Sequence, residues 1–201
     1  MNHPLRLLLL ALLSLLVLRC GTLRSERSKL RSLEVRSRTE WKAAAPKPYR
    51  THVPVRLTVH HEGTRLAAGT DPARKILAIQ RWGMGPDRNW ADVPYHYFIA
   101  PDGTIYQGRD VNTVGETNTE YDPAGHLLIV CLGNLNEDPV PPEQLAALIR
   151  LVAWCSRTYR IPLSTLATHR DHSKQTTCPG KNLYAYFQNG HVQKAAAKLL
   201  R

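Results

Sequence analysis

Beyond the first fifty residues, apolar positions follow patterns that predict β-strands. Val55–His60 alternates apolar and polar side chains, as in a strand that buries one face. Leu127–Leu132 is continuously apolar, which is typical of a central strand. Tyr95–Ala100 and Thr104–Gln107 flank Pro101-Asp102-Gly103, a turn signal, so they are predicted to form a hairpin.

Three segments show helical patterns instead. Asp71-Pro72 provides an N-cap and a first-turn proline for a helix with apolar residues at helical spacing. A longer helix is predicted to begin at Pro141 and to end before Pro162, with a buried stripe of Leu145, Leu148, Ile149 and Val152. A short helix is predicted over Asn182–Phe187. Strands interspersed with helices indicate an α/β domain.

The start of the chain has a different pattern. Leu7–Leu18 is apolar except for Ser14, which is too short for a membrane span of about 20 residues and typical of a signal-peptide core, so we assign residues 1–20 to a signal peptide. Cys20 follows the run as in bacterial lipoprotein signals, although Arg19 replaces the usual small residue. Lipidation, ordinary cleavage and an uncleaved anchor all stay open, and the first and last would attach the protein to a membrane.

The charge is concentrated near this leader. The 201 residues carry a formal net charge of +11, of which +8 lies in residues 1–50. Residues 21–35 are interpreted as a basic linker that solvent surrounds. Basic residues do not cluster in the remainder, which argues against a nucleic-acid partner. A hydrophobic content of 43% excludes a wholly disordered chain.

Four short segments contain candidate chemistry: His60-His61, Tyr95-His96, His169–His172 and Cys178-Pro179-Gly180. Catalytic zinc is held by three protein ligands, commonly imidazole or thiolate, with one coordination position open. Two histidines from separate elements and one cysteine would meet that demand. Each segment alone is a weak signal, because a cysteine is more often a small buried apolar residue.

Strand alternation helps to choose between the adjacent histidines. His61 falls on the face shared by Leu57 and Val59, which is the expected core face. His60 shares the other face with Thr58. If a cleft opens on this polar side, His60 is the ligand and His61 supports it from behind.

Taken together and in order, six segments resemble the type 2 N-acetylmuramoyl-L-alanine amidases, and most closely their peptidoglycan-recognition-protein branch. The resemblance spans roughly residues 36–187 and rests on Arg38-Thr39-Glu40-Trp41, Val59-His60-His61, Asp92–Phe98, Asp102–Arg109, Leu132-Gly133-Asn134, and His169-Arg170-Asp171 followed by Cys178-Pro179-Gly180.

This resemblance implies a single domain over 36–190 with a central mixed β-sheet flanked by helices, followed by a tail or helix over 191–201. It implies a Zn²⁺ amidase that cuts the bond between N-acetylmuramic acid and the first alanine of the stem peptide. By the same resemblance His60, His169 and Cys178 are the metal ligands, and Tyr95 is the catalytic tyrosine.

The chain departs from the family pattern in several places. His169 and Cys178 are nine residues apart where eight is usual, and the intervening His172 could compete as a ligand. Thr176 replaces a catalytic lysine of the phage enzymes. Gly115-Glu116-Thr117-Asn118 stands where Gly-Ala-His-Thr is common, so Glu116 is expected to add a negative charge near the stem peptide.

The expected partners are peptidoglycan or muropeptides, bound by an exported monomer in the cell envelope or the medium. A second function is a recognition module that binds peptidoglycan without cutting it. Such binders commonly lose the third ligand, whereas Cys178 and Tyr95 are both present, which favours the enzyme. Cys131 and Cys155 form either a disulfide, which export permits, or two buried thiols.

Overall fold

One mixed sheet organises the protein. The computed structural model describes residues 33–201, so the predicted signal peptide, Cys20 and most of the linker lie outside the described residues. The strand order is β3-β2-β4-β1-β5. The β2–β3 pair is antiparallel and the other pairs are parallel, which confirms the predicted mixed sheet. The strands are β1 (Arg56–His61), β2 (Tyr97–Ile99), β3 (Ile105–Gln107), β4 (His126–Cys131) and β5 (Ala167–Thr168).

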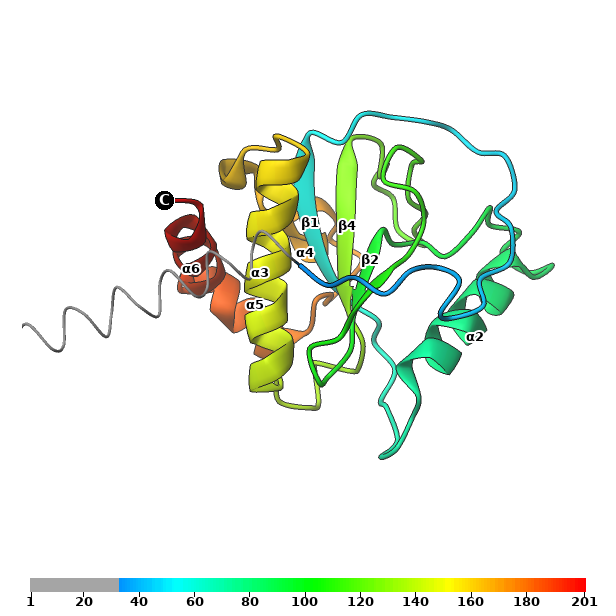
Figure 1. Cartoon of the computed structure of the whole chain (residues 1–201), viewed down its shortest axis with the longest axis horizontal. Helices are drawn as coiled ribbons and strands as arrows, with labels where there is room; N and C mark the ends of the chain where they lie inside the picture. Colours follow the sequence, from blue (N-terminus) through cyan, green and yellow to red (C-terminus); the bar gives the residue numbers. More distant parts are fainter. Residues whose placement is uncertain (1–32) are drawn as a thin grey trace, which may run out of the picture.

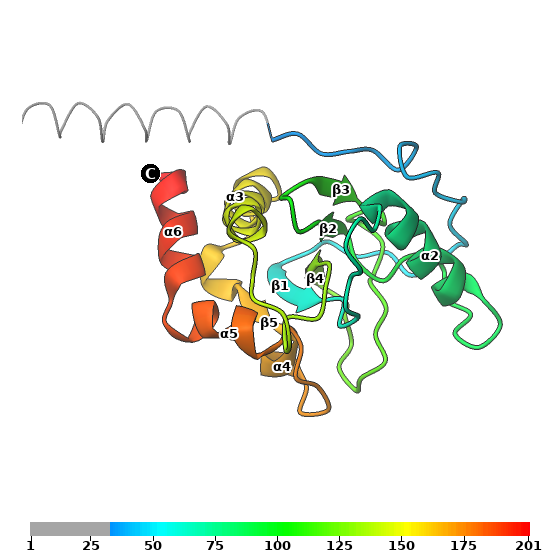
Figure 2. The same cartoon turned by 90° about the horizontal axis from the view of Figure 1, so that it is seen from below.

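Helices cover both faces of this sheet (Figures 1 and 2). On one face lie α3 (Pro142–Thr158), α5 (Lys181–Gln188) and α6 (His191–Leu200), whose apolar side chains share a core with Leu57, Val59 and Ile129 of the strands. The other face is covered by α2 (Pro72–Met84). The short η1 (Leu163–Thr165) and α4 (His169–His172) flank β5.

The face covered by α2 has its own apolar cluster. Ile76 and Ile79 of α2 pack with Phe98 and Val130 of the sheet and with Trp41. Five of the six residues of β1 are buried, and Thr58 and His60 on its second face lie against residues of α4, so the prediction that this strand buries one face only is wrong. The physical reason is that β1 is an inner strand between β4 and β5, and such strands are covered on both sides.

The other predicted elements agree with the structure apart from one helix face. The helices α2 and α5, the hairpin and the central strand β4 are confirmed. In α3 only Leu148 and Val152 of the predicted stripe are fully buried, whereas Leu145 and Ile149 are partly exposed. The stripe begins instead at Gln144, whose side-chain amide donates to two carbonyl groups at the ends of strands. Because a polar residue occupies a core position, the apolar pattern did not reveal which face of α3 is buried.

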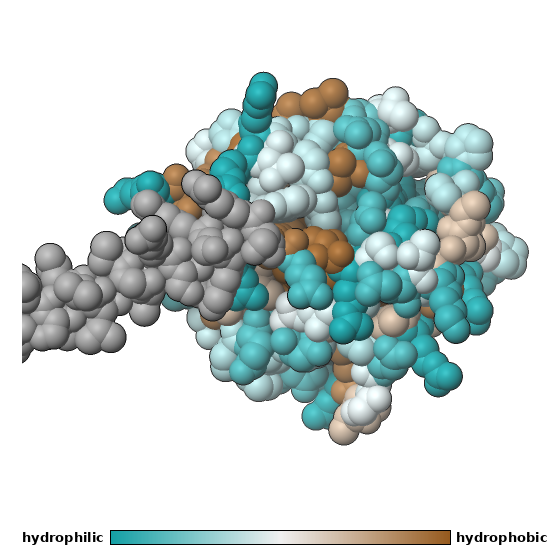
Figure 3. Space-filling view, in the orientation of Figure 1, coloured by the Kyte–Doolittle hydropathy of each residue, from teal (hydrophilic) through white to brown (hydrophobic). Residues whose placement is uncertain are grey.

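Both ends of the described chain pack onto the domain. Leu33 and Val35, from the end of the assigned linker, lie against the core, and Val192 and Ala196 of α6 are fully buried in it. In residues 33–201 we find no helix with the length and apolar character of a membrane span. The face seen in Figure 3 is mostly hydrophilic, with apolar side chains in small separate patches.

Candidate metal centre

Parallel pairing of β1 with β5 brings two histidines together at one sheet edge. The register pairs Val59 with Thr168, so the next residues along each strand, His60 and His169, are neighbours. The carboxyl ends of parallel strands are a common position for ligand sites. His169 is also the first residue of α4, which has a capping box: Thr168 donates its backbone N–H (2.8 Å) and its hydroxyl (2.7 Å) to the carboxylate of Asp171. This cap fixes the backbone that carries His169.

The third candidate ligand arrives from the loop after α4. The Arg170 N–H donates to the Cys178 carbonyl (2.9 Å), which holds the loop against α4. The Cys178 N–H donates to the Thr176 hydroxyl (3.0 Å), and the His61 N–H donates to the Cys178 Sγ (3.3 Å). The thiol is therefore placed beside the end of β1 by backbone contacts.

These three side chains form a group with metal-site dimensions. The nitrogen and sulfur atoms of His60, His169 and Cys178 lie within 4.8 Å of one another, and all three residues are buried. His60 Nδ1 is 3.6 Å from the Cys178 Sγ. Ligands of one tetrahedral zinc ion, at about 2.3 Å for sulfur and about 2.0 Å for nitrogen, lie about 3.5 Å apart. The donor set and the spacing therefore suit Zn²⁺.

One polar atom at this centre lacks a protein partner. His60 Nε2 is buried, and it neither accepts nor donates a hydrogen bond within the described part of the chain. Buried polar atoms of this kind are few in folded proteins and commonly mark a place that an ion or water completes. The orphaned nitrogen is therefore consistent with a site that holds an additional group.

Burial also keeps the imidazoles neutral. It lowers the pKa of His60 well below its ordinary value, with a further contribution from His169, and it lowers the pKa of His169 to about 4. Neutral imidazole is the form that binds metals. Burial raises the pKa of the Cys178 thiol to about 12, although the His61 N–H opposes this. A metal ion reverses the preference of such a thiol, because it binds the thiolate.

Tyr95 stands beside this group, just before β2. Its ring centroid is 5.1 Å from that of His60 and 5.7 Å from that of Phe98, which it meets edge to face. Gly108 permits this position, because a Cβ there would lie 2.2 Å from the Tyr95 carbonyl oxygen and 2.9 Å from the Phe98 ring. Burial, with Cys178 as the next contribution, raises the pKa of Tyr95 well above its ordinary value, so the hydroxyl stays protonated.

A cavity opens over these side chains and continues toward α2. It has a volume of about 220 Å³ and its walls include all three candidate ligands and Tyr95. A neighbouring cavity of about 450 Å³ shares five lining residues with it, namely Glu62, Trp90, Pro94, Tyr95 and Asn118. The two cavities therefore form one groove that runs from the metal-ligand group to α2.

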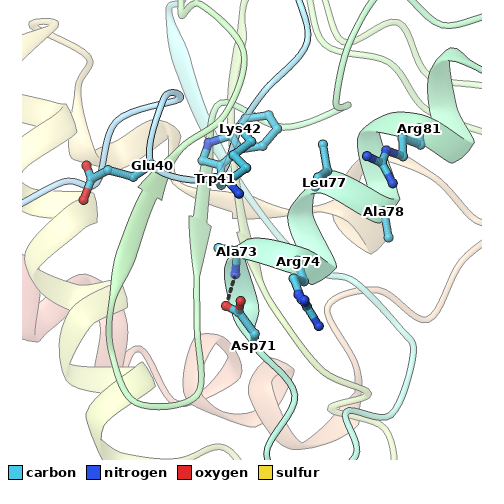
Figure 4. A pocket seen from close by; sticks show the side chains of 9 residues that line it. All are labelled: Glu40, Trp41, Lys42, Asp71, Ala73, Arg74, Leu77, Ala78 and Arg81. Atoms are coloured by element: carbon cyan, nitrogen blue, oxygen red, sulfur yellow. Dashed lines mark hydrogen bonds between the residues drawn. The ribbon is translucent and has the colours of Figure 1, made fainter.

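A larger hollow lies elsewhere on the described domain. About 670 Å³ in volume, it is bounded by α2 and the Glu40–Lys42 turn (Figure 4). Its lining contains no histidine or cysteine and shares no residue with the cavity over His60. It therefore takes no part in the candidate metal centre.

Two departures noted in the sequence take on other roles than expected. Glu116 does not present a free negative charge to the groove, because its carboxylate forms a buried ion pair with Arg109. His172 is absent from the ligand group found in residues 33–201. Its ring stacks on Tyr121, and its Nε2 lies 3.4 Å from the Thr58 hydroxyl. The extra residue between His169 and Cys178 therefore does not separate the predicted ligands His60, His169 and Cys178.

His61 is not a member of the ligand group found in residues 33–201. Its Nδ1 accepts a hydrogen bond from the Leu135 N–H (3.1 Å), which ties β1 to the loop after β4. This position agrees with the expectation that His61 supports the site from behind. Burial lowers the pKa of His61 to about 4, so this acceptor stays unprotonated.

Sequence reasoning missed two residues of the loop before β4. The Thr119 hydroxyl is 2.8 Å from His169 Nε2, and the Tyr121 ring centroid is 5.1 Å from that of His169. Nothing in the local pattern of this polar loop distinguishes them, since both contacts depend on the packing of the loop onto α4. The remaining two described cysteines, Cys131 and Cys155, are buried free thiols rather than a disulfide.

Comparisons with known proteins agree with this geometry. Residues 50–181 match the family described as N-acetylmuramoyl-L-alanine amidase. Peptidoglycan recognition protein 1 of Bos taurus is 32% identical over 157 residues, which is 76% of this chain and 81% of that protein. The solved structure of the N-acetylmuramoyl-L-alanine amidase LysC from Clostridium intestinale URNW has 27% identity and a TM-score of 0.63, covering 78% of this chain and 97% of that one.

A third comparison includes a ligand. A variant of Drosophila PGRP-LB solved in complex with tracheal cytotoxin has 26% identity and a TM-score of 0.65, covering 77% of this chain and 92% of that one. The sequence comparisons and the fold comparisons thus indicate the same family. The chain belongs to the family of type 2 N-acetylmuramoyl-L-alanine amidases and peptidoglycan recognition proteins.

Proposed function

We propose that this protein is a zinc-dependent N-acetylmuramoyl-L-alanine amidase that acts on peptidoglycan or on muropeptides. The observation that carries the proposal is the buried group of His60, His169 and Cys178 with the Tyr95 side chain beside it. A binding module needs none of these four side chains at the base of its groove, whereas an amidase needs a metal and a hydrogen-bond donor there.

In this proposal His60, His169 and Cys178 hold the ion. Zinc supplies a Lewis acid that polarises the scissile carbonyl group and lowers the pKa of bound water. The groove between the ligand group and α2 holds the substrate and limits access of bulk water to the scissile bond. His61 and the capping box of α4 keep the ligand-bearing backbone in place.

The role proposed for Tyr95 follows from its protonation state. Its raised pKa keeps a hydroxyl proton available over the physiological pH range, so the side chain donates a hydrogen bond to the oxyanion that develops on the scissile carbonyl. A preorganised donor of this kind contributes a factor of about 10²–10³ to kcat in other hydrolases. Phe98 behind the ring restricts its movement.

The test combines metal analysis with digestion of purified sacculi. The purified protein is expected to contain one zinc ion and to release stem peptides with a free alanine amino terminus. Cys178→Ser removes both properties, whereas Tyr95→Phe keeps the zinc and lowers the rate about 10²-fold or more. Binding to sacculi with zinc present but without release of peptides would replace the amidase by the recognition module, which the similarity to peptidoglycan recognition protein 1 makes the second candidate.

Delivery of the enzyme is proposed from the sequence alone. Export through residues 1–20, with the basic segment over 21–35 as a linker, would bring the catalytic domain to the cell envelope, where peptidoglycan lies. Fractionation of cells that express the wild type and Cys20→Ala tests the mode of attachment. A lipoprotein loses its acyl anchor in the variant, a cleaved secreted protein is soluble in both cases, and an uncleaved anchor keeps both proteins in the membrane fraction.

A further inference from the structure

Three consecutive residues of the loop that precedes β4 contact α4 or the two residues that follow it. Thr119 places its hydroxyl 2.8 Å from His169 Nε2. Glu120 accepts hydrogen bonds from the Ser173 hydroxyl (2.6 Å) and from the Lys174 N–H (3.1 Å). Tyr121 packs its ring against that of His169, with centroids 5.1 Å apart. The loop therefore fixes both the position of α4 and the orientation of the one imidazole that α4 contributes to the candidate metal centre.

From this geometry we propose that Thr119 is a positioning residue for His169, which orients the imidazole and selects its tautomer for zinc binding. The inference rests on the metal site of the proposed function. A metal-binding histidine uses one ring nitrogen for the ion, and its other nitrogen carries a proton that needs an acceptor. The Thr119 oxygen provides this acceptor at Nε2, which leaves Nδ1 of His169 unprotonated and free to bind the metal.

The hydroxyl of Thr117 determines which partner donates in the hydrogen bond between Thr119 and His169. Thr117 Oγ1 lies 3.0 Å from Thr119 Oγ1 and accepts the Thr119 N–H at 3.2 Å. When the Thr119 hydroxyl donates its proton to Thr117, its lone pairs face His169 and accept the Nε2 proton. Thr117 belongs to the segment that departs from the common Gly-Ala-His-Thr pattern of the family, whereas Thr119 follows that segment. The departure thus supplies the hydroxyl that orients Thr119 rather than the direct partner of the ligand.

Burial makes this contact effective. His169 is only 8% exposed, so water has little access to replace a missing acceptor at Nε2. An N–H that is buried without a partner favours rotation of the ring or the other tautomer. Either change removes Nδ1 from its position as a ligand. Partners of this kind commonly affect metal affinity by about 10–100-fold.

Two substitutions at one position separate the hydroxyl from the shape of the side chain. Thr119→Val keeps the branched shape and removes the acceptor, whereas Thr119→Ser keeps the acceptor. Zinc affinity is measured by competition with a chelator, and the absorption spectrum of the Co²⁺-substituted protein reports the ligand geometry. We expect Thr119→Val to bind zinc about 10–100-fold more weakly with an altered cobalt spectrum, and Thr119→Ser to stay within about threefold of the wild type.

Thermal unfolding of the metal-free proteins shows whether each variant is folded, and Thr119→Ala replaces Thr119→Val if the latter is not. Wild-type zinc affinity and an unchanged cobalt spectrum in Thr119→Val would overturn the proposal. So would a wild-type protein that binds no zinc. A wild type that binds zinc without amidase activity would overturn the proposed function only, because the effect of Thr119 on affinity is measured independently of catalysis.

Discussion

The ion pair between Arg109 and Glu116 tests how burial determines the contribution of a charged pair to the free energy of unfolding. The Arg109 side chain is fully buried and that of Glu116 is 7% exposed. The guanidinium also donates to the carbonyl groups of Val93 (2.7 Å), Val114 and Asp92 (3.3 Å). The group therefore joins the residues before β2 to the loop that lines the groove. Arg109→Met removes the charge and these donors but keeps much of the side-chain volume.

The expected loss follows from what the substitution leaves behind. Without Arg109, the Glu116 carboxylate stays in a nearly water-free position with no cation beside it, and three carbonyl groups lose a donor. Removing one partner of a buried pair typically lowers the free energy of unfolding by about 3–5 kcal/mol. Since small domains are stable by about 5–15 kcal/mol, this is a large fraction of the total.

The chain offers a matched control on its surface. Arg50 and Asp122 also form an ion pair, at 2.7 Å, but their side chains are 53% and 58% exposed. Arg50→Met is therefore expected to lower the free energy of unfolding by about 1 kcal/mol or less. Urea unfolding of both variants at neutral pH measures the two losses. Equal losses, or a loss below about 1 kcal/mol for Arg109→Met, would refute the argument that burial sets the difference.

Three further predictions concern buried polar groups of the domain. His60→Ala should abolish zinc binding measured by metal analysis. His61→Ala should keep the zinc and lower the unfolding free energy by about 1–3 kcal/mol, because the Leu135 N–H loses its acceptor. The opposite pattern would show that His61 is the ligand. His96 has its pKa lowered to about 3 by burial, so its contribution to stability is complete above pH about 6.5 and is lost as the pH falls toward 3, by about 1.4 kcal/mol per pH unit. His96→Gln should therefore flatten the dependence of unfolding free energy on pH in this interval, and an unchanged slope would contradict the assignment. The Tyr121 hydroxyl is buried without a hydrogen-bond partner among the described residues, so Tyr121→Phe should unfold at the same or a higher urea concentration; a loss above about 1 kcal/mol would reveal a partner for the hydroxyl.

Local patterns in the sequence were sufficient for most elements of the fold. The Asp71 cap accepts the Ala73 N–H at 2.9 Å as its position before Pro72 predicted, and the Pro101–Gly103 turn joins β2 to β3. These features depend on neighbouring residues, so they can be read without knowledge of the fold. The buried face of α3 could not be read in this way. Gln144 can occupy a buried position because strand-end carbonyl groups from elsewhere in the chain accept its amide protons.

The same distinction between local pattern and tertiary packing applies to the candidate site. By itself the sequence determined which residue types were available for metal chemistry, and strand alternation separated His60 from His61 before any contact was known. The sequence indicated the proximity of His60 and His169, more than a hundred residues apart, only through the family resemblance, and the tertiary structure supplied its physical reason in the parallel register of β1 with β5. Only the tertiary structure decided that Glu116 is neutralised by Arg109 and that Thr119 contacts His169. Partners that lie far apart in the chain are chosen by packing and burial, and these leave no periodic signal in the sequence.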